Sequence, residues 1–429
     1  MAMSRFQAFY CFLVLSPLLT AALQTQCPWN PTIPPLQPAG SCVLPIDDGT
    51  PMQVLNTSRE LPWTHPPSCV IPNSAASAEK FCVYSSSAFN DGSGIAIIAD
   101  PETAAGVAGT VQDPLPAWRS RQHLARNGRL ATETVDLPYA VTPIPGKGLG
   151  VVATKRIKRF ETILKSYPAM IADSEFLSLR KKKAVVDGPR LFQKALDQLP
   201  DKERFLTMSR SEEEHVHAVE DVIKTNAFAI IVDGRNMKGV YPEIARLNHA
   251  CDANSSAYSK FTKKDLAMSA VATRDIEPGE EITVSYIPLG MPTAHRTRAL
   301  KNWGFNCTCN LCSASPEARA ASDERRERLR EVYQTIQHES TSYNTLVKLT
   351  QELVDLAQVE GLLAKVGEYY QAFMRIYYRA GDAQTARKYG RTSLKLAEIF
   401  ADPEGVLCTG LKGDLEQLDR LIQGGGGGG

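Results

Sequence analysis

The residues Arg246-Leu247-Asn248-His249-Ala250-Cys251-Asp252-Ala253-Asn254 form the first of three motifs that lie close together in this chain. The second is Gly279-Glu280-Glu281-Ile282-Thr283-Val284-Ser285-Tyr286, and the third is Cys307-Thr308-Cys309-Asn310-Leu311-Cys312. In the second motif apolar residues alternate with polar ones. This alternation predicts a strand that ends at Tyr286 and carries the tyrosine on its apolar face.

The cysteines of the third motif stand at C-x-C-x-x-C spacing, which indicates a metal site. A structural zinc site takes four ligands in a tetrahedron, so three cysteines need a fourth from elsewhere. Cys251 is the nearest candidate upstream. The alternative is a disulfide between two of the four, but loops this short favour a shared metal. We therefore predict a Zn²⁺ site made of Cys251, Cys307, Cys309 and Cys312.

The three motifs, with Lys147-Gly148-Leu149-Gly150 upstream, resemble the core and post-SET segment of SET-domain protein methyltransferases, most closely the SMYD-type branch. The resemblance covers residues 143–313. The family's usual motif reads N-H-S-C-x-P-N, and here Ala250 and Ala253 replace its serine and proline. SMYD-type proteins usually carry a zinc-binding MYND insertion. We expect none here, because no cysteine lies between Cys82 and Cys251.

The resemblance implies S-adenosylmethionine-dependent methylation of a lysine in a histone or another protein. It makes Tyr286 the catalytic residue, whose hydroxyl orients the lysine amine, and Phe228 a wall of the lysine channel. The residues implied to contact the cofactor are Lys147, Gly148, Leu149, Gly150, Asn226, Asn248, His249 and Phe305.

From the residues alone, plainer interpretations stay open. Tyr286 is then a core tyrosine, residues 147–150 are a strand-entry turn, and His249 is a core histidine. We interpret Glu280 and Glu281 as surface or turn-supporting groups.

The length of 429 residues allows two or three domains, and we predict the α+β class. A β-rich SET fold is expected over 143–290, with a helical insertion at 172–225, and a post-SET zinc segment over 291–313. A linker helix is expected within 117–142. Apolar residues at helical spacing predict an all-α domain over 314–423, similar to tetratricopeptide arrays, before a glycine tail at 424–429.

The N-terminal residues predict export. Arg5, an apolar run and small residues near Ala22 are typical of a signal peptide over 1–22, the alternative being an uncleaved membrane anchor. Residues 23–116 are rich in cysteine, proline and serine and predict a disulfide-stapled module, or else an extended leader. An even set of cysteines there suggests two disulfides of undetermined pairing: Cys27, Cys42, Cys69 and Cys82.

Charge and targeting set the expected partners. Lys and Arg number 48 against 47 Asp and Glu, which gives no support to direct nucleic-acid binding. We expect a monomer that acts on a protein substrate, without a transmembrane span once the signal peptide is cleaved. The signal peptide predicted over residues 1–22 implies the secretory pathway. If these residues are not a signal peptide, the alternative is the nucleus or cytoplasm. The competing function is an inactive SET-fold scaffold that binds partners.

Overall fold

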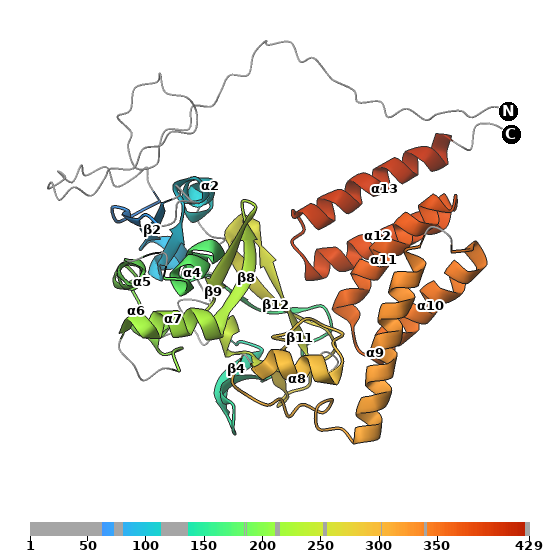
Figure 1. Ribbon diagram of the computed structural model, residues 1–429, viewed down its shortest axis with the longest axis horizontal. Helices are drawn as coiled ribbons and strands as arrows, with labels where there is room; N and C mark the ends of the chain where they lie inside the picture. The colour runs from blue at the N-terminus through green and yellow to red at the C-terminus, as the bar shows by residue number, and fades with distance from the viewer. Residues whose placement is uncertain are drawn as a thin grey trace, which may run out of the picture.

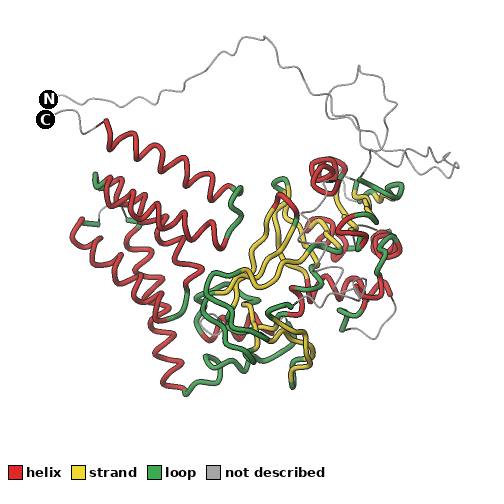
Figure 2. The backbone as a smooth tube through the Cα atoms, turned by 180° about the vertical axis from the view of Figure 1, so that it is seen from behind, coloured by secondary structure: helices red, strands yellow, loops and turns green. Residues whose placement is uncertain are grey.

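The computed structural model describes residues 62–424, except 73–79, 113–135, 184, 186, 211–214, 252–254, 302 and 339–340. The chain has a strand-rich half that is followed by a helical half (Figure 1). From behind, the helices of the second half stand together on one side of the strands (Figure 2). Over the described ranges, every helix is too short or too polar to cross a lipid bilayer. The predicted signal peptide, Cys27 and Cys42 lie outside these ranges.

The largest sheet has six strands, and its first three come from the N-terminal part of the chain. In spatial order the strands are β1 (Ser68–Val70), β2 (Phe81–Ser86), β3 (Ile95–Ala99), β7 (Met170–Asp173), β9 (Arg235–Val240) and β8 (Ala227–Val232). β3 and β7 run parallel, and the other neighbours run antiparallel. Ile95 and Ile97 of β3 enter one core, while Ala96 and Ile98 enter another. The sheet is therefore buried on both faces at β3.

This sheet corrects the expected domain boundary near residue 116. We expected residues 23–116 to form a module of their own. Their described part instead supplies β1, β2, α1 (Phe89–Gly92), β3 and α2 (Pro101–Gln112) to the same cores as the strands from 143–290. The reason is that β3 has no polar face, so it needs a neighbour on each side and an apolar layer on each face.

Cys69 and Cys82 stand opposite each other on β1 and β2 and form a disulfide. The sequence predicted disulfides in this region and left their pairing open. The disulfide ties the edge strand β1 to its only neighbour within the described sheet.

Two smaller sheets complete the strand-rich half. One has the order β10 (Asn248–His249), β13 (Glu281–Val284), β5 (Gly148–Ala153), β4 (Tyr139–Ile144). The other has the order β11 (Ala257–Thr262), β12 (Ala267–Ala272), β6 (Thr162–Ser166). The short helices η1 (Ile244–Arg246) and η3 (Lys263–Asp265) precede β10 and β12.

The linker helix expected within 117–142 falls mostly on residues 117–135, which lie outside the described ranges, and β4 begins at Tyr139. One expected strand is wrong at its end. The strand expected to reach Tyr286 ends at Val284. The reason is that the Tyr286 backbone N–H donates to the His249 ring rather than to a neighbouring strand.

Four helices separate β7 from β8, in the range where a helical insertion was expected. They are α4 (Ser174–Lys181), α5 (Gly188–Asp197), α6 (Lys202–Leu206) and α7 (His215–Asn226). Asp173 starts α4 because its carboxylate accepts hydrogen bonds from the first backbone N–H groups. The apolar residues that pack these helices on the six-stranded sheet include Phe176, Leu191, Phe192, Leu196, Phe205, Val219 and Val222.

The C-terminal part is helical, as predicted. After α8 (Thr293–Lys301) come α9 (Pro316–Ile336), α10 (Tyr343–Val359), α11 (Leu363–Arg379), α12 (Ala383–Phe400) and α13 (Val406–Gly424). The predicted one-faced stripes are confirmed, since Leu329, Val332, Leu346 and Leu353 are buried in one core. The likeness to tetratricopeptide arrays stays a prediction.

The described halves touch at several places, and one of them is the end of α12. The Phe400 ring lies 5.9 Å from the Phe160 ring and 5.6 Å from the Tyr258 ring, measured between centroids. Next to it, the Asp402 carboxylate accepts a hydrogen bond of 2.9 Å from the Lys263 backbone N–H. Apolar and polar contacts together fix α12 against β11 and η3.

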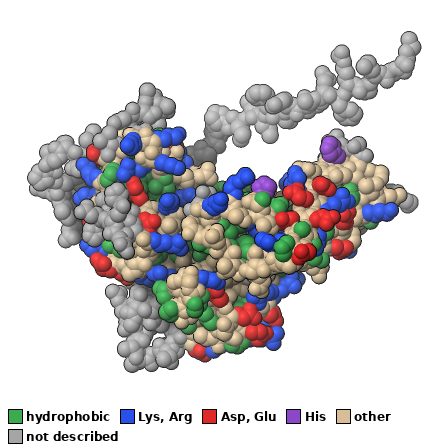
Figure 3. Space-filling view, turned by 60° about the horizontal axis from the view of Figure 1, so that its bottom comes forward, with side chains coloured by type: hydrophobic (Ala, Val, Ile, Leu, Met, Phe, Trp, Pro, Cys, Tyr) green, Lys and Arg blue, Asp and Glu red, His purple; other side chains and the backbone are tan. Residues whose placement is uncertain are grey.

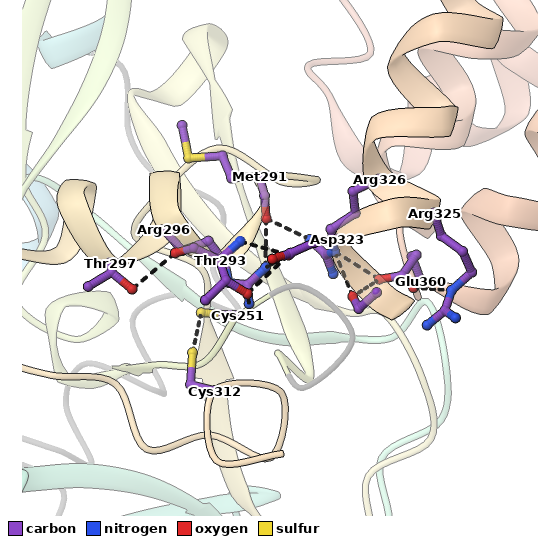
Figure 4. A network of polar contacts seen from close by, with 11 residues as sticks. Cys251, Met291, Thr293, Arg296, Thr297, Cys312, Asp323, Arg325, Arg326 and Glu360 are labelled. Carbon is purple, nitrogen blue, oxygen red and sulfur yellow. Dashed lines mark hydrogen bonds and ion pairs between the residues drawn. The ribbon is translucent and has the colours of Figure 1, made fainter. Parts of the chain in front are cut away.

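Another contact joins α8 to α9 through a polar network (Figure 4). The Asp323 carboxylate accepts from the backbone N–H and the hydroxyl of Thr293, at 2.8 and 3.0 Å. Arg296 and Arg326 both donate to the Met291 carbonyl. The side chain of Arg296 is buried, so these bonds are needed to offset its desolvation. Elsewhere on the surface, acidic and basic side chains are interspersed over the described residues in view (Figure 3).

Candidate functional site

A cavity of about 630 Å³ opens between the β4–β5 turn and the loop that follows α8. Its size lies within the range of small-molecule sites, roughly 300–1,000 Å³. Tyr286 and Arg210 face it from two further segments. The remaining lining residues are Pro145, Gly146, Lys147, Gly148, Asn248, His249, Phe305, Asn306, Cys307, Thr308 and Cys309. Segments far apart in the sequence thus form one pocket.

The β4–β5 turn forms one wall, and glycine is required at two of its positions. Gly148 has φ +73°, a backbone conformation that residues with a side chain rarely adopt. At Gly150 a Cβ atom would lie 2.8 Å from the Asn248 Nδ2 atom and 2.5 Å from the Ile144 side chain. The first glycine shapes the turn, and the second lets Asn248 approach β5.

Asn248 is held by two acceptors. Its Nδ2 group donates to the Leu149 carbonyl at 3.2 Å and to the Glu281 carboxylate at 2.9 Å. The other oxygen of Glu281 pairs with the Lys147 ammonium at 2.6 Å. Leu149 does not itself line the cavity and contributes this carbonyl. Glu281 therefore supports the turn, which was one of the two interpretations from the sequence.

His249 connects Tyr286 to the cysteines. Its Nδ1 atom accepts a hydrogen bond from the Tyr286 backbone N–H at 3.0 Å, so the proton of the neutral ring is on Nε2. Nε2 lies 3.2 Å from the Cys251 sulfur and donates to it. Burial lowers the pKa of His249 to about 4, so the ring is neutral at physiological pH.

Tyr286 lies in an aromatic cluster after the end of β13. Its hydroxyl donates to the Leu247 carbonyl at 2.7 Å. The rings of Trp303 and His249 lie 4.9 and 5.3 Å from its ring, and Phe305 packs edge-on at 6.3 Å. Burial raises the pKa of Tyr286 to about 12, which keeps its hydroxyl protonated at neutral pH.

Four cysteines meet beside the pocket, as predicted, and we call them the sulfur cluster. Cys251, Cys307, Cys309 and Cys312 have all their sulfur atoms within 4.8 Å of one another. Cys251 lies 3.9 Å from Cys307 and 3.7 Å from Cys312, sulfur to sulfur. A tetrahedral zinc ion with thiolate bonds of about 2.3 Å requires about 3.8 Å between sulfurs. The cluster therefore fits a metal ion and can hold one.

Hydrogen bonds within the sulfur cluster shift the pKa values of its thiols in both directions, raising that of Cys251 and lowering that of Cys309. Hydrogen bonds from the Cys251, Cys307 and Cys312 side chains hold the pKa of Cys309 well below its usual value. A thiolate is the form that binds metal. The His249 N–H that points at Cys251 is the outer-shell donor that metal-bound sulfur commonly receives.

Besides Leu149 and Gly150, two more residues implied by the resemblance do not line the cavity. The Asn226 amide lies 3.0 and 3.2 Å from the carbonyls of Met208 and Val222, so its donors are used within the helical insertion. Phe228 packs edge-on against Tyr241 at 6.1 Å. Neither therefore shares the pocket with Asn248 and Tyr286.

Sequence reasoning also missed residues that the fold brings to the site. Arg210 and Asn306 line the cavity, and Trp303 packs on Tyr286. The spacing Trp303-Gly304-Phe305 was a possible signal for the tryptophan, because aromatic residues two apart next to a metal motif can flank one pocket. Arg210 had no such signal, since it lies far from the motifs in sequence.

A second cavity, of about 320 Å³, lies between the two halves of the molecule. Ser285 and Ile287 line this cavity, whereas Tyr286 between them lines the first one. Lys365 and Glu368 of α11 complete its wall. Tyr286 thus lines the first cavity, and its two neighbours in the chain line the second.

The part of the chain that matches a known family includes most of the segments that form the pocket. Residues 148–287 match the family described as the SET domain. The chain contains a SET domain. The match begins at Gly148 in the β4–β5 turn and ends at Ile287, so the SET domain holds the turn, Asn248, His249, Cys251 and Tyr286.

Several curated methyltransferases are similar to the chain. Histone-lysine N-methyltransferase set5 of Schizosaccharomyces pombe is 30% identical over 199 residues, covering 44% of this chain and 56% of that protein. Human histone-lysine N-methyltransferase SMYD3 is 41% identical over 75 residues, covering 17% of each. N-lysine methyltransferase SMYD2-B of Danio rerio is 33% identical over 125 residues, covering 29% of this chain and 26% of that protein. The chain thus spans less than two thirds of the length of these relatives.

Proposed function

We propose that this protein transfers a methyl group from S-adenosylmethionine to a lysine side chain of a protein substrate. The names of the relatives support the reaction class, since each is a histone-lysine or N-lysine methyltransferase. The observation that carries the proposal is the cavity of about 630 Å³ whose lining includes Asn248, His249 and Tyr286. In the proposal this cavity takes the methyl donor, and the substrate lysine reaches Tyr286 from the side where Ser285 and Ile287 line the second cavity.

The residues of the larger cavity suit the donor. When bound, S-adenosylmethionine supplies an electrophilic methyl group on a cationic sulfonium centre. Gly148 and Gly150 leave room for a ligand and for Asn248. Because both Asn248 amide hydrogens are used, its Oδ1 atom remains to accept from the ligand. Phe305 and His249 offer flat surfaces for packing.

Tyr286 orients the lysine amine in this proposal. Its hydroxyl hydrogen points at the Leu247 carbonyl, so its oxygen is free to accept an N–H bond from the amine. This aligns the nitrogen lone pair for in-line attack on the methyl carbon. The amine must arrive neutral, although its ordinary pKa is about 10.4, and an aromatic, desolvated lane favours the neutral form.

We infer further that the metal of the sulfur cluster is zinc. Four thiolates without an open position are typical of structural zinc sites. Zinc would join Cys251 to the loop 303–312 and so fix Phe305 and Trp303 against Tyr286. The metal then acts on the reaction only through the shape of the pocket.

The first test is isothermal titration of the full chain with S-adenosylhomocysteine, with bound zinc quantified on the same sample. We expect a Kd in the micromolar range, on the order of −8 kcal/mol, that is lost in Asn248→Ala. Transfer of labelled methyl groups to lysine peptides should then follow in wild type and fail in Tyr286→Phe. A folded, zinc-loaded protein that binds no S-adenosylhomocysteine would contradict the proposal and favour the scaffold function.

A further inference from the structure

Glu281 occupies a position that joins two walls of the pocket. It is the first residue of β13 and pairs with Val152 of β5. Its side chain is only 20% exposed. The carboxylate lies between Lys147 of the β4–β5 turn and Asn248 of β10, two residues that line the cavity. Glu281 itself does not line it.

Each oxygen of this carboxylate has its own donor. Oε2 lies 2.6 Å from the Lys147 ammonium, and Oε1 accepts from the Asn248 amide at 2.9 Å. Gly150 keeps the space open, since a Cβ there would lie 3.2 Å from Oε1 and 2.8 Å from the amide. A carboxylate has two acceptor oxygens, so each donor is satisfied by an oxygen of its own.

The amide contact fixes which end of Asn248 faces the ligand. Both atoms beside the Asn248 nitrogen are acceptors, the Leu149 carbonyl and the Glu281 carboxylate. The NH₂ group must therefore face them, and Oδ1 is turned away from them. Without the carboxylate, the amide could rotate and present a donor to the cavity in place of an acceptor.

The ion pair between Lys147 and Glu281 changes the net charge beside the pocket. Lys147 lines the cavity with a positive charge, and the proposed donor carries a second positive charge on its sulfonium. Like charges in a partly desolvated site repel each other. Glu281 offsets the charge of Lys147, so it favours a cationic ligand over a neutral one of the same shape.

We propose that Glu281 is a positioning residue that selects the cationic methyl donor by fixing Asn248 and neutralising Lys147. This inference rests on the proposed function of the pocket. It makes a prediction that a purely structural role does not make: the loss of Glu281 changes the ratio of affinities for S-adenosylmethionine and S-adenosylhomocysteine, because only the first carries the sulfonium charge.

The test is titration of the full chain with both ligands. Glu281→Gln keeps the size but only one acceptor oxygen. We expect its Kd for S-adenosylhomocysteine to rise about tenfold and its Kd for S-adenosylmethionine to rise by a further factor of about three. Glu280→Gln is the matched control: Glu280 is the preceding residue, and its carboxylate pairs with Arg274 at the surface, 2.7 Å away. It should bind both ligands as wild type does.

A second variant keeps the test decisive if Glu281→Gln does not fold. Lys147→Met removes the ammonium and leaves the carboxylate, so the affinity for S-adenosylmethionine relative to S-adenosylhomocysteine should increase at least threefold. An unchanged ratio in this variant, or wild-type Kd values in a folded Glu281→Gln, would overturn the inference. If wild type itself binds neither ligand, the proposed function fails instead, so the two failures are distinguishable.

Discussion

The sulfur cluster and the Cys69–Cys82 disulfide use the same side chain in two different ways. The disulfide joins residues 13 positions apart on neighbouring strands, at the edge of the six-stranded sheet. The sulfur cluster joins Cys251 to Cys307 and Cys312, which are 56 and 61 positions away. The first links strands that already pair, whereas the second brings a distant loop to a pocket. We therefore expect the disulfide to affect stability and the sulfur cluster to affect ligand binding.

The largest effect should come from breaking the sulfur cluster. Cys309→Ser, or removal of the metal by a chelator, releases the loop that carries Phe305 and Cys307 from Cys251. We expect the affinity for S-adenosylhomocysteine to fall on the order of 100-fold, since the pocket loses a wall. Titration before and after chelation measures this. Cys408→Ser is the control, because Cys408 is buried in the helical half away from both groups. An equal affinity for S-adenosylhomocysteine with and without the metal would contradict the role of the sulfur cluster in ligand binding.

A loss of comparable size, in turnover and not in donor affinity, is expected from Tyr286→Phe. This residue touches the sulfur cluster only through His249, so the variant should keep its metal and its donor affinity within a few-fold. Losing the hydroxyl that orients the amine should lower kcat about 100-fold. Single-turnover methyl transfer at saturating donor checks this. Tyr369→Phe, in the helical core, is the control and should keep wild-type kcat. A fall in donor affinity as large as the fall in kcat would contradict this role.

Removing the disulfide tests the expectation that this bond affects stability and not ligand binding. The double variant Cys69→Ala with Cys82→Ala should lower the free energy of unfolding by about 2–3 kcal/mol, because it frees a short loop of the unfolded chain. Denaturant unfolding of oxidised wild type and the variant measures the change. Binding of S-adenosylhomocysteine should stay within twofold of wild type. Loss of binding here would show that the six-stranded sheet also shapes the pocket.

The smallest effect concerns alkaline stability. The pKa of Tyr286 is about 12 in the folded protein and about 10 when unfolded, so the folded state holds this proton longer. The stabilisation is complete below pH 10 and is lost as the pH rises from 10 to 12. At pH 11 the loss is about 1.4 kcal/mol. The free energy of unfolding of wild type, relative to that of Tyr286→Phe, should therefore be about 1.4 kcal/mol lower at pH 11 than at pH 8. Unfolding curves of both proteins at the two pH values measure this. A difference that is independent of pH would contradict a buried, neutral tyrosine.

The motifs alone located a large part of this site. The sequence predicted that Cys251, Cys307, Cys309 and Cys312 would meet, and they do. Asn248, His249 and Phe305, which the resemblance implied, line the pocket. Short-range spacing restricts how Cys307, Cys309 and Cys312 can share one ligand, whereas the other three residues were implied by the resemblance. Asn226 and Phe228 did not reach the pocket, because their partners belong to the helical insertion and to Tyr241.

The helices of the C-terminal half and the grouping of Cys307, Cys309 and Cys312 could be predicted from the sequence, because apolar periodicity and cysteine spacing are local properties. Long-range packing brings Cys251 to these cysteines and residues 81–112 into the sheet and cores of the SET domain. It also brings Glu281 to Lys147 and Asn248. Strand alternation shows which side chains share a face, but the segment that covers that face is chosen by long-range packing.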